Sequence, residues 1–193
     1  GYADVLASQQ GYSGSNGRVY AYYGSASGVS TSVGAIIEAP PGITGRRFGF
    51  LLECAGDMDG NGYGDVVVTT VVPESLPAVY FYAGSATGIG TTPIKSGGLS
   101  AGSGGSRAID TGDLNGDGYS DVLARTGSFS MLTVFYGGPS WLSALPSAQG
   151  NWETVGSATF GDFDADGYSD LLTLFTYSTP SFLQNKIQRG SPT

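Results

Sequence analysis

One acidic, glycine-containing loop occurs three times along the chain. The copies are Asp57–Asp65, Asp113–Asp121 and Asp162–Asp170, and a fourth keeps only its tail, Gly1–Asp4. Oxygen-bearing side chains stand at loop positions 1, 3, 5 and 9, and glycine stands at position 6. Calcium prefers oxygen ligands in this arrangement, and the glycine permits the sharp turn that gathers them. The repetition therefore constrains both the architecture and the ligand.

Each complete loop is predicted to bind one calcium ion through five ligands. Positions 1, 3, 5 and 9 contribute side-chain oxygens, and position 7 contributes a backbone carbonyl. Three complete sites result, and the tail at Asp4 would contribute to a fourth site that is truncated at the N-terminus. The predicted ligands, site by site, are Asp57, Asp59, Asn61, Tyr63 and Asp65; Asp113, Asn115, Asp117, Tyr119 and Asp121; and Asp162, Asp164, Asp166, Tyr168 and Asp170.

Two other interpretations of these loops can be weighed by counting. An EF-hand needs a glutamate at position 12 and helices on both sides. Position 12 is Val68, Ala124 or Thr173, each within an expected strand, so the EF-hand is excluded. Ordinary Asx-Gly turns between strands are the alternative that remains. Three copies with matching ligands favour metal sites over such turns, and the number of protein oxygens favours calcium over magnesium.

The spacing of the loops predicts an all-β repeat fold. The position-9 aspartates are separated by 61, 56 and 49 residues, a period typical of propeller blades. An apolar run follows each of them, and a second strand ending at glycine comes next, as in Val79–Gly84. Further strands are expected before each complete loop, at 48–54, 107–110 and 155–160, and fainter ones near 35–39 and 93–95. Four short antiparallel strands per unit predict a β-propeller, with no helical period in any window.

The chain is expected to be a single propeller segment, residues 1–193, of about three and a half blades. The approximate repeats are 1–45, 46–105, 106–151 and 152–193. The aromatic residues of the second strands are expected to pack between blades. Cys54 is the only cysteine and lies among apolar residues, so it is expected to be a buried small hydrophobe.

At these residues the chain resembles the FG-GAP repeat of integrin α-subunit propellers and of related secreted proteins, some of which are lectins. Phe48-Gly49 matches the opening of that repeat, the three acidic loops match its calcium motif, and Gly17–Gly24 matches a later strand. The GAP element itself is poorly kept. Because propellers of this family usually have seven blades, the resemblance implies a fragment of a longer propeller, or a half-ring completed by pairing into a homodimer.

The resemblance also implies a function. It points to a secreted or cell-surface, calcium-stabilised module of the adhesion or lectin type, without enzymatic activity, that binds a glycan or an extracellular protein. The alternatives are a structural segment of a larger surface protein and a carbohydrate-active enzyme. Tyr12, Trp141 and Trp152 are aromatic residues in expected loops, but they assign no sugar site.

Composition narrows the range of partners. Of the 16 acidic residues, 11 belong to the four loops, so the net charge of −8 reflects the loops rather than a general acidic surface. The largest basic cluster is Arg46-Arg47, which argues against nucleic acid as a partner. No apolar run suggests membrane insertion. The chain has no histidine, which excludes a Ser-His-Asp or Cys-His centre. Acids left for a carboxylate pair are Glu38, Glu53, Glu74, Asp110 and Glu153.

Overall fold

The computed structural model describes most of the chain. The described residues are 2–71, 79–97, 107–126, 131–140, 148–150, 155–176 and 183–188. Trp141, Trp152, Glu74 and Glu153 lie outside them. Within the described residues, strands dominate, and the one helical element is the four-residue α1 (Tyr12–Ser15). None of the described residues forms a helix that is both long and apolar enough to cross a membrane.

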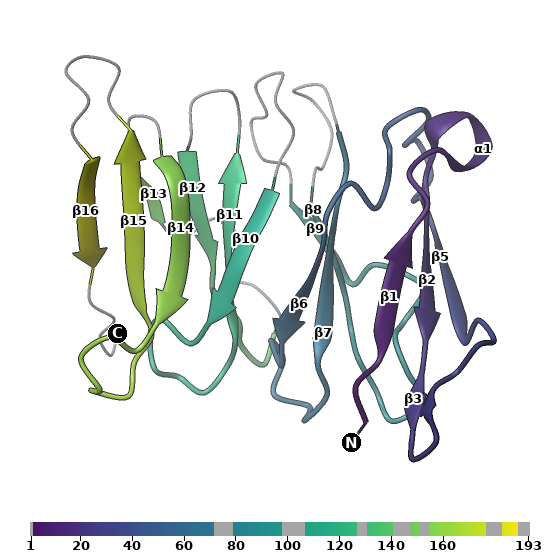
Figure 1. The fold of residues 1–193 in the computed structure, drawn as a ribbon, viewed down its shortest axis with the longest axis horizontal. Helices are drawn as coiled ribbons and strands as arrows, with labels where there is room; N and C mark the ends of the chain where they lie inside the picture. The colour runs from purple at the N-terminus through teal and green to yellow at the C-terminus, as the bar shows by residue number, and fades with distance from the viewer. Residues whose placement is uncertain are drawn as a thin grey trace.

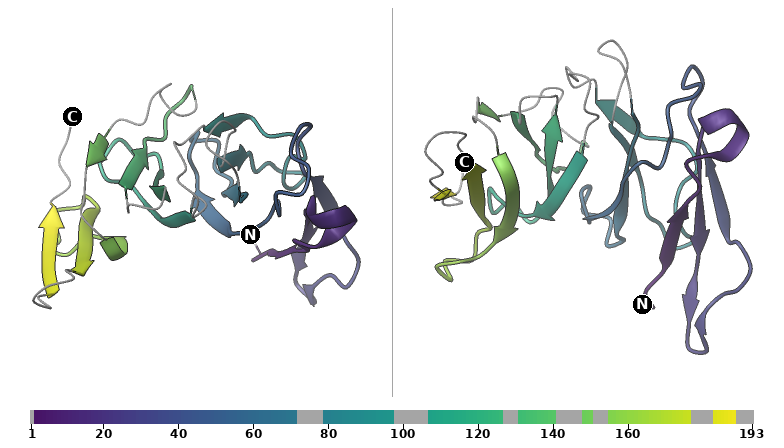
Figure 2. Two further views of the ribbon diagram at one scale, coloured as in Figure 1. Left: turned by 90° about the horizontal axis from the view of Figure 1, so that it is seen from above. Right: turned by 45° about the horizontal axis from the view of Figure 1, so that its top comes forward.

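Four antiparallel sheets, here called blades 1 to 4, follow one another in chain order (Figure 1). Seen from above, they are arranged along an arc (Figure 2). Blade 1 contains β1 (Val5–Ser8), β2 (Arg18–Tyr22) and β5 (Ala35–Glu38); blade 2 contains β6 (Leu52–Gly56), β7 (Asp65–Thr69), β8 (Val79–Tyr82) and β9 (Lys95–Gly97); blade 3 contains β10 (Arg107–Gly112), β11 (Asp121–Thr126), β12 (Met131–Phe135) and β13 (Ala148–Gly150); blade 4 contains β14 (Val155–Gly161), β15 (Asp170–Thr176) and β16 (Leu183–Gln188). This architecture confirms the predicted partial β-propeller.

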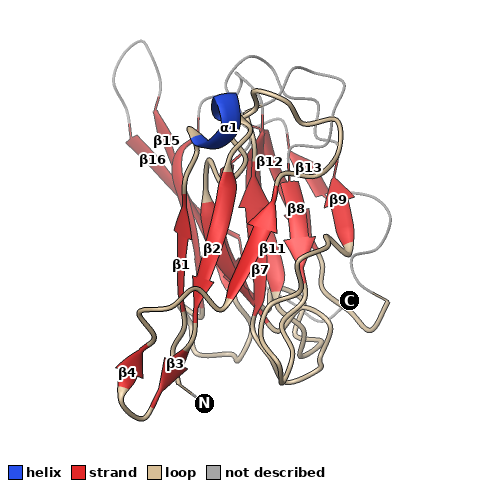
Figure 3. Cartoon of the chain, turned by 90° about the vertical axis from the view of Figure 1, so that its right-hand side faces the viewer, coloured by secondary structure: helices blue, strands red, loops and turns tan. Residues whose placement is uncertain are grey.

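Blade 1 carries two additions at its opposite ends (Figure 3). The turn α1 lies at one end, and there the Tyr12 ring stacks on the Arg18 guanidinium, whose carbon is 3.6 Å from the ring centroid. A small hairpin of β3 (Gly24–Ser25) and β4 (Gly28–Val29) lies at the other. Tyr12 is therefore engaged in packing within the blade.

Most predicted strands appear at the expected places, with shifted bounds. The strand expected from residue 48 begins at Leu52, because Arg47 and Gly49 have positive φ of 52° and 81° and the chain turns there. This strand and those before the other two loops run on to the glycine preceding position 1. The strand expected at 93–95 is β9, Lys95–Gly97.

The core lies between the blades. Strand β7 shows why, since it is buried on both faces: Val66 and Val68 pack toward blade 1, whereas Val67 packs toward blade 3. The predicted packing of aromatic residues between blades is confirmed for Tyr80 and Tyr82, which are 4% and 0% exposed. The three interblade clusters of buried residues are Val19, Ile37, Ile43, Phe48, Val66, Val68, Tyr80 and Tyr82; Ala55, Met58, Val67, Val79, Phe81, Val122, Ala124 and Phe135; and Leu123, Val134 and Leu171.

The prediction for Cys54 is wrong, because this residue is exposed. The register of β6 with β7 shifts between Cys54 and Gly56, which marks a β-bulge. The extra residue, Ala55, is fully buried. Cys54 itself lines a cavity between blades 1 and 2, on the opposite face of β6 from Ala55, so its thiol is not part of the core.

Candidate metal centres

Each acidic loop joins the first two strands of its blade, and all three loops lie at the lower end of the blades in Figure 1. In the first loop, the carboxylate at position 1 holds the turn together. Asp57 Oδ1 accepts the N–H groups of Gly60 and Asn61 at 2.8 and 3.0 Å, and Oδ2 accepts that of Gly62 at 2.7 Å. Gly60 and Gly62 have positive φ, which explains the glycines there.

The second and third loops repeat this arrangement. Asp113 accepts the N–H groups of Asp117 and Gly118 at 3.1 and 2.9 Å. Asp162 accepts those of Asp166 and Gly167 at 3.1 and 3.0 Å. In each loop, the side-chain oxygen at position 5 also accepts the position-7 N–H, at 2.8, 3.0 and 2.9 Å. Three loops of different sequence thus share one conformation.

The aspartate at position 9 is buried in every complete loop. Asp65, Asp121 and Asp170 are at most 1% exposed, and each heads the second strand of its blade. One carboxylate oxygen accepts the N–H at position 2 of the same loop, from Met58 at 2.7 Å in the first case. The other accepts an N–H just after the next strand, from Gly84 at 2.9 Å or Gly137 at 2.9 Å. This carboxylate therefore ties the loop to two strands.

In each of two loops, the carboxylate oxygens are close enough to bind one ion together. Ligand atoms of Asp57, Asp59 and Asp65 all lie within 4.8 Å of one another, and so do those of Asp162, Asp164 and Asp166. Oxygens bound to one calcium ion at 2.3–2.6 Å lie at most about 5 Å apart, so the arrangement fits this ion. In the second loop the amide of Asn115 replaces a carboxylate at position 3, and its oxygen accepts the N–H of Asp117 at 3.2 Å.

The truncated copy keeps one contact of the complete loops. Asp4 Oδ1 accepts the N–H of Gly24 at 2.8 Å, as Asp65 does with Gly84. Asp4 itself is exposed. The side chain at position 9 thus adopts its place in this copy as well.

Sequence reasoning missed the role of position 2. Met58 is fully buried in the cluster between blades 2 and 3, and Leu114 packs against the next cluster. A signal was present, since position 2 is Met58, Leu114 and Phe163, all apolar in an otherwise polar loop. Phe163 is 49% exposed. The loops at Met58 and Leu114 are therefore anchored to the interblade core as well as to their own blade.

Burial changes the acidity of the position-9 carboxyls. Burial raises the pKa of Asp65 to about 6, although the N–H bonds from Gly84 and Met58 oppose the shift and the charges of Asp59 and Asp57 add to it. Burial likewise raises the pKa of Asp121 to about 6, against the N–H bonds from Gly137 and Leu114. Without a cation, burial therefore makes both groups easier to protonate than a free aspartate.

A pH dependence of opposite sign with and without calcium is expected. In chelator, the stabilisation that protonation of Asp65 and Asp121 contributes is present below their unfolded pKa, near 3.8, and is lost as pH rises through about 6. The thermal midpoint in chelator should thus decrease as the pH is raised from about 5 to about 7. In calcium it should rise, because the ion requires the carboxylate form.

Circular dichroism melts with chelator and with calcium, across that pH range, check this expectation. The double variant Asp65→Asn, Asp121→Asn provides the control, since it should flatten the chelated profile. A chelated wild-type protein that becomes more stable from about pH 5 to about pH 7 would contradict the sign.

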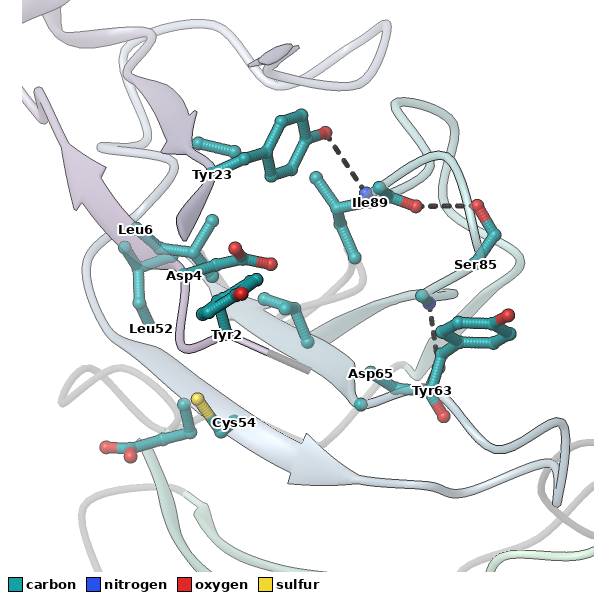
Figure 4. Close-up of a pocket in the computed structure, with 16 residues that line it drawn as sticks. Tyr2, Asp4, Leu6, Tyr23, Leu52, Cys54, Tyr63, Asp65, Ser85 and Ile89 are labelled. Carbon is teal, nitrogen blue, oxygen red and sulfur yellow. Dashed lines mark hydrogen bonds between the residues drawn. The ribbon is translucent and has the colours of Figure 1, made fainter. Parts of the chain in front are cut away.

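A cavity of about 430 Å³ lies between blades 1 and 2 (Figure 4). Three tyrosines line it, Tyr2, Tyr23 and Tyr63, together with the acidic residues Asp4, Glu53 and Asp65. The Tyr23 hydroxyl closes one side by accepting the N–H of Ile89 at 3.2 Å.

The same place one blade further on contains the first acidic loop. The residues that correspond to Tyr63 and Gly64 there are Tyr119 and Ser120, and they contact Gly60 and Asp57 of the first loop. The cavity thus takes, between blades 1 and 2, the place that an acidic loop takes between blades 2 and 3.

Comparison with known proteins agrees with this architecture. A family model described as an FG-GAP-like repeat matches residues 57–124, which include two complete loops. Integrin alpha-E of Mus musculus is 29% identical over 121 residues, covering 56% of this chain and 10% of the integrin. Integrin alpha-E of Homo sapiens is 29% identical over 138 residues, covering 65% and 12%. The chain thus spans about a tenth of the length of these relatives. It is a segment of a β-propeller built from FG-GAP-like repeats, the repeat type that it shares with integrin α-subunits.

Proposed function

We propose that this chain is a calcium-stabilised, non-enzymatic binding module of the extracellular adhesion type. One observation carries the proposal: three loops with matching oxygen donors share one hydrogen-bonded conformation at the same end of successive blades. Carboxylates held this close repel one another unless a cation neutralises them. A divalent ion in each loop would stabilise the strands that the loop joins.

The chemistry of the donors favours calcium. The side-chain donors are carboxylates and amides only, with four carboxylates in the third loop and three in each of the others. Calcium accepts six to eight oxygens in flexible geometry, whereas magnesium keeps several waters and demands a near-octahedral shell. In this proposal the fifteen ligands predicted above bind three ions, with tyrosine carbonyls at position 7.

Two of the described acids outside the loops make structural contacts. Glu38 pairs with Arg18, and Asp110 accepts the N–H of Phe160 at 2.7 Å and the hydroxyl of Thr159. Burial and then the charge of Asp110 raise the pKa of Glu53. The contacts of Glu38 and Asp110 support binding rather than hydrolysis.

The relatives support a proposal for the kind of partner. Both curated matches are integrin α-subunits, which supports an extracellular setting and a protein surface as the ligand. A glycan is the second candidate, from the resemblance to secreted lectins. In either case the calcium ions stabilise the module, and pairing with the rest of a propeller or with a second copy would cover the outer blades.

Calorimetric titration is expected to give three calcium ions per chain. Asp164→Ala should remove one of them, because it takes a central oxygen from the third loop. Asp110→Asn is the matched control, since it changes an acid outside the loops and should leave three. A wild-type stoichiometry of zero, or a loss of one ion in Asp110→Asn, would contradict the metal assignment.

Binding of the chain to immobilised extracellular proteins and to a glycan array, in calcium and in chelator, tests the recognition part. Calcium-dependent binding to proteins supports the adhesion assignment, and binding to glycans alone would replace it with a lectin. Hydrolysis of a polysaccharide panel would overturn the non-enzymatic assignment. Sedimentation in calcium shows whether two copies pair.

A further inference from the structure

Each acidic loop is contacted by the loop of the following blade. The Tyr119 ring lies against Gly60 of the first loop, where a Cβ would be only 2.6 Å from Tyr119 Cε1. The Tyr168 ring lies even closer to Gly116 of the second loop. Both glycines occupy position 4, and both tyrosines occupy position 7. The contact therefore repeats with the blades.

Backbone hydrogen bonds accompany each tyrosine. Ser120 N–H donates to the carbonyl of Asp57 at 3.0 Å, and Ser169 N–H donates to that of Asp113 at 2.9 Å. These carbonyls belong to position 1, whose carboxylate organises the loop. In the first loop, Met58 O also accepts the N–H of Gly138 at 2.8 Å.

Glycine immediately before position 1 makes the close approach possible. A Cβ on Gly112 would lie 2.8 Å from Ser169 Oγ, and one on Gly56 would collide with Ser120. The glycines at positions 0 and 4 thus bracket the first half of the loop, and the following blade packs against both.

We propose that Tyr119 and Tyr168 are positioning residues for the metal site of the preceding blade. This inference rests on the calcium binding proposed above. The backbone carbonyl of each tyrosine is assigned to its own loop, whereas its ring packs against position 4 of the loop before it, and the N–H of the following serine bonds to the position-1 carbonyl of that loop. By packing there, the ring keeps the turn in the conformation in which the carboxylate of Asp57 or Asp113 accepts its N–H groups. The ring thereby raises metal affinity without binding the ion, as residues around a ligand shell do.

Tyr63 offers a matched control within the same chain. It occupies the same loop position as Tyr119, yet its side chain is 43% exposed and covers no metal loop in the described part of the structure. Truncation of Tyr63, Tyr119 or Tyr168 to alanine leaves the backbone carbonyl in place. The variants therefore differ only in whether a preceding loop loses its cover.

Calcium titration followed by amide NMR resolves the sites. The N–H groups of Gly62, Gly118 and Gly167 each donate to the position-1 carboxylate of their own loop, so each reports one site. Tyr119→Ala is expected to raise the calcium concentration at half-saturation about tenfold at Gly62, with at most a small change at Gly167. Tyr168→Ala should do the same at Gly118. Tyr119→Phe should restore the wild-type value, and Tyr63→Ala should change none.

Each outcome decides between the inferences. Weakening at Gly118 but not Gly62 in Tyr119→Ala, or equal weakening at all three glycines, would overturn the positioning role. So would unchanged affinity at every site. A wild-type chain whose glycines ignore calcium would overturn the proposed function itself. Hydrogen exchange in chelator gives a readout without metal. The Gly60 and Asn61 amides should exchange faster in Tyr119→Ala than in the wild type, and at the wild-type rate in Tyr63→Ala.

Discussion

Removal of calcium is expected to lower the free energy of unfolding by about 8 kcal/mol, the largest single effect foreseen for this protein. A ligand present at a hundred times its dissociation constant stabilises the folded state by about 2.7 kcal/mol per site, and three loops carry the predicted ligand set. Each complete loop joins the first two strands of blade 2, 3 or 4, so all three contribute to the stability gained from calcium. Most domains are stable by about 5–15 kcal/mol, which leaves the chelated chain marginal.

Urea unfolding in chelator and in saturating calcium measures this difference. The midpoint should move strongly to higher urea with calcium and much less with magnesium at the same concentration. Equal midpoints in calcium and in chelator would show that the loops are turns closed by hydrogen bonds alone.

Asp65→Ala is expected to cost about 2 to 4 kcal/mol even in chelator, at neutral pH. The substitution removes the acceptor of the Met58 and Gly84 N–H groups, and each buried N–H left unpaired costs about 1–3 kcal/mol. Part of this loss is offset, because the fold no longer buries a carboxylate whose pKa is raised to about 6. Urea unfolding in chelator separates this structural cost from any loss of an ion.

Asp4→Ala is the matched control for Asp65→Ala. Asp4 has the same place in its repeat and accepts the equivalent N–H, from Gly24, but Asp4 is exposed and Gly24 is only partly buried, so water can replace the bond. Its cost should stay below about 1 kcal/mol. Similar costs for the two variants would show that burial does not distinguish the two aspartates.

Sequence patterns predicted the repeating parts of the structure well. Short-range rules govern the loops, since glycine at position 6 and oxygens at alternate positions specify one turn whatever surrounds it. The arrangement of β7 and β8 followed for the same reason, because an apolar run after an aspartate and a second run ending in glycine form a hairpin. Val66–Val68 and Val79–Tyr82 both lie within those strands.

Apart from the packing of aromatic residues, the sequence did not show how neighbouring blades contact one another. The exposure of Cys54 depends on the cavity between blades 1 and 2, and nothing in the local run of apolar residues signals that cavity or the extra residue at Ala55. The stacking of Tyr119 on Gly60 joins residues more than fifty positions apart. The only sign of this contact in the sequence was the recurrence of tyrosine at position 7. The predicted role of the position-7 carbonyl as a ligand did not require the tyrosine ring.

The burial of β7 on both faces has a consequence for how this strand finds its alignment. Three consecutive valines fill its middle, so sliding the strand by one residue would place a valine where a valine already was, and the apolar packing would resist only weakly. The ends would resist. Asp65 would lose its N–H partners, and Thr69, whose hydroxyl accepts the Leu51 N–H at 3.1 Å, would lose its own. Two buried polar side chains thus set the register of an otherwise uniform strand.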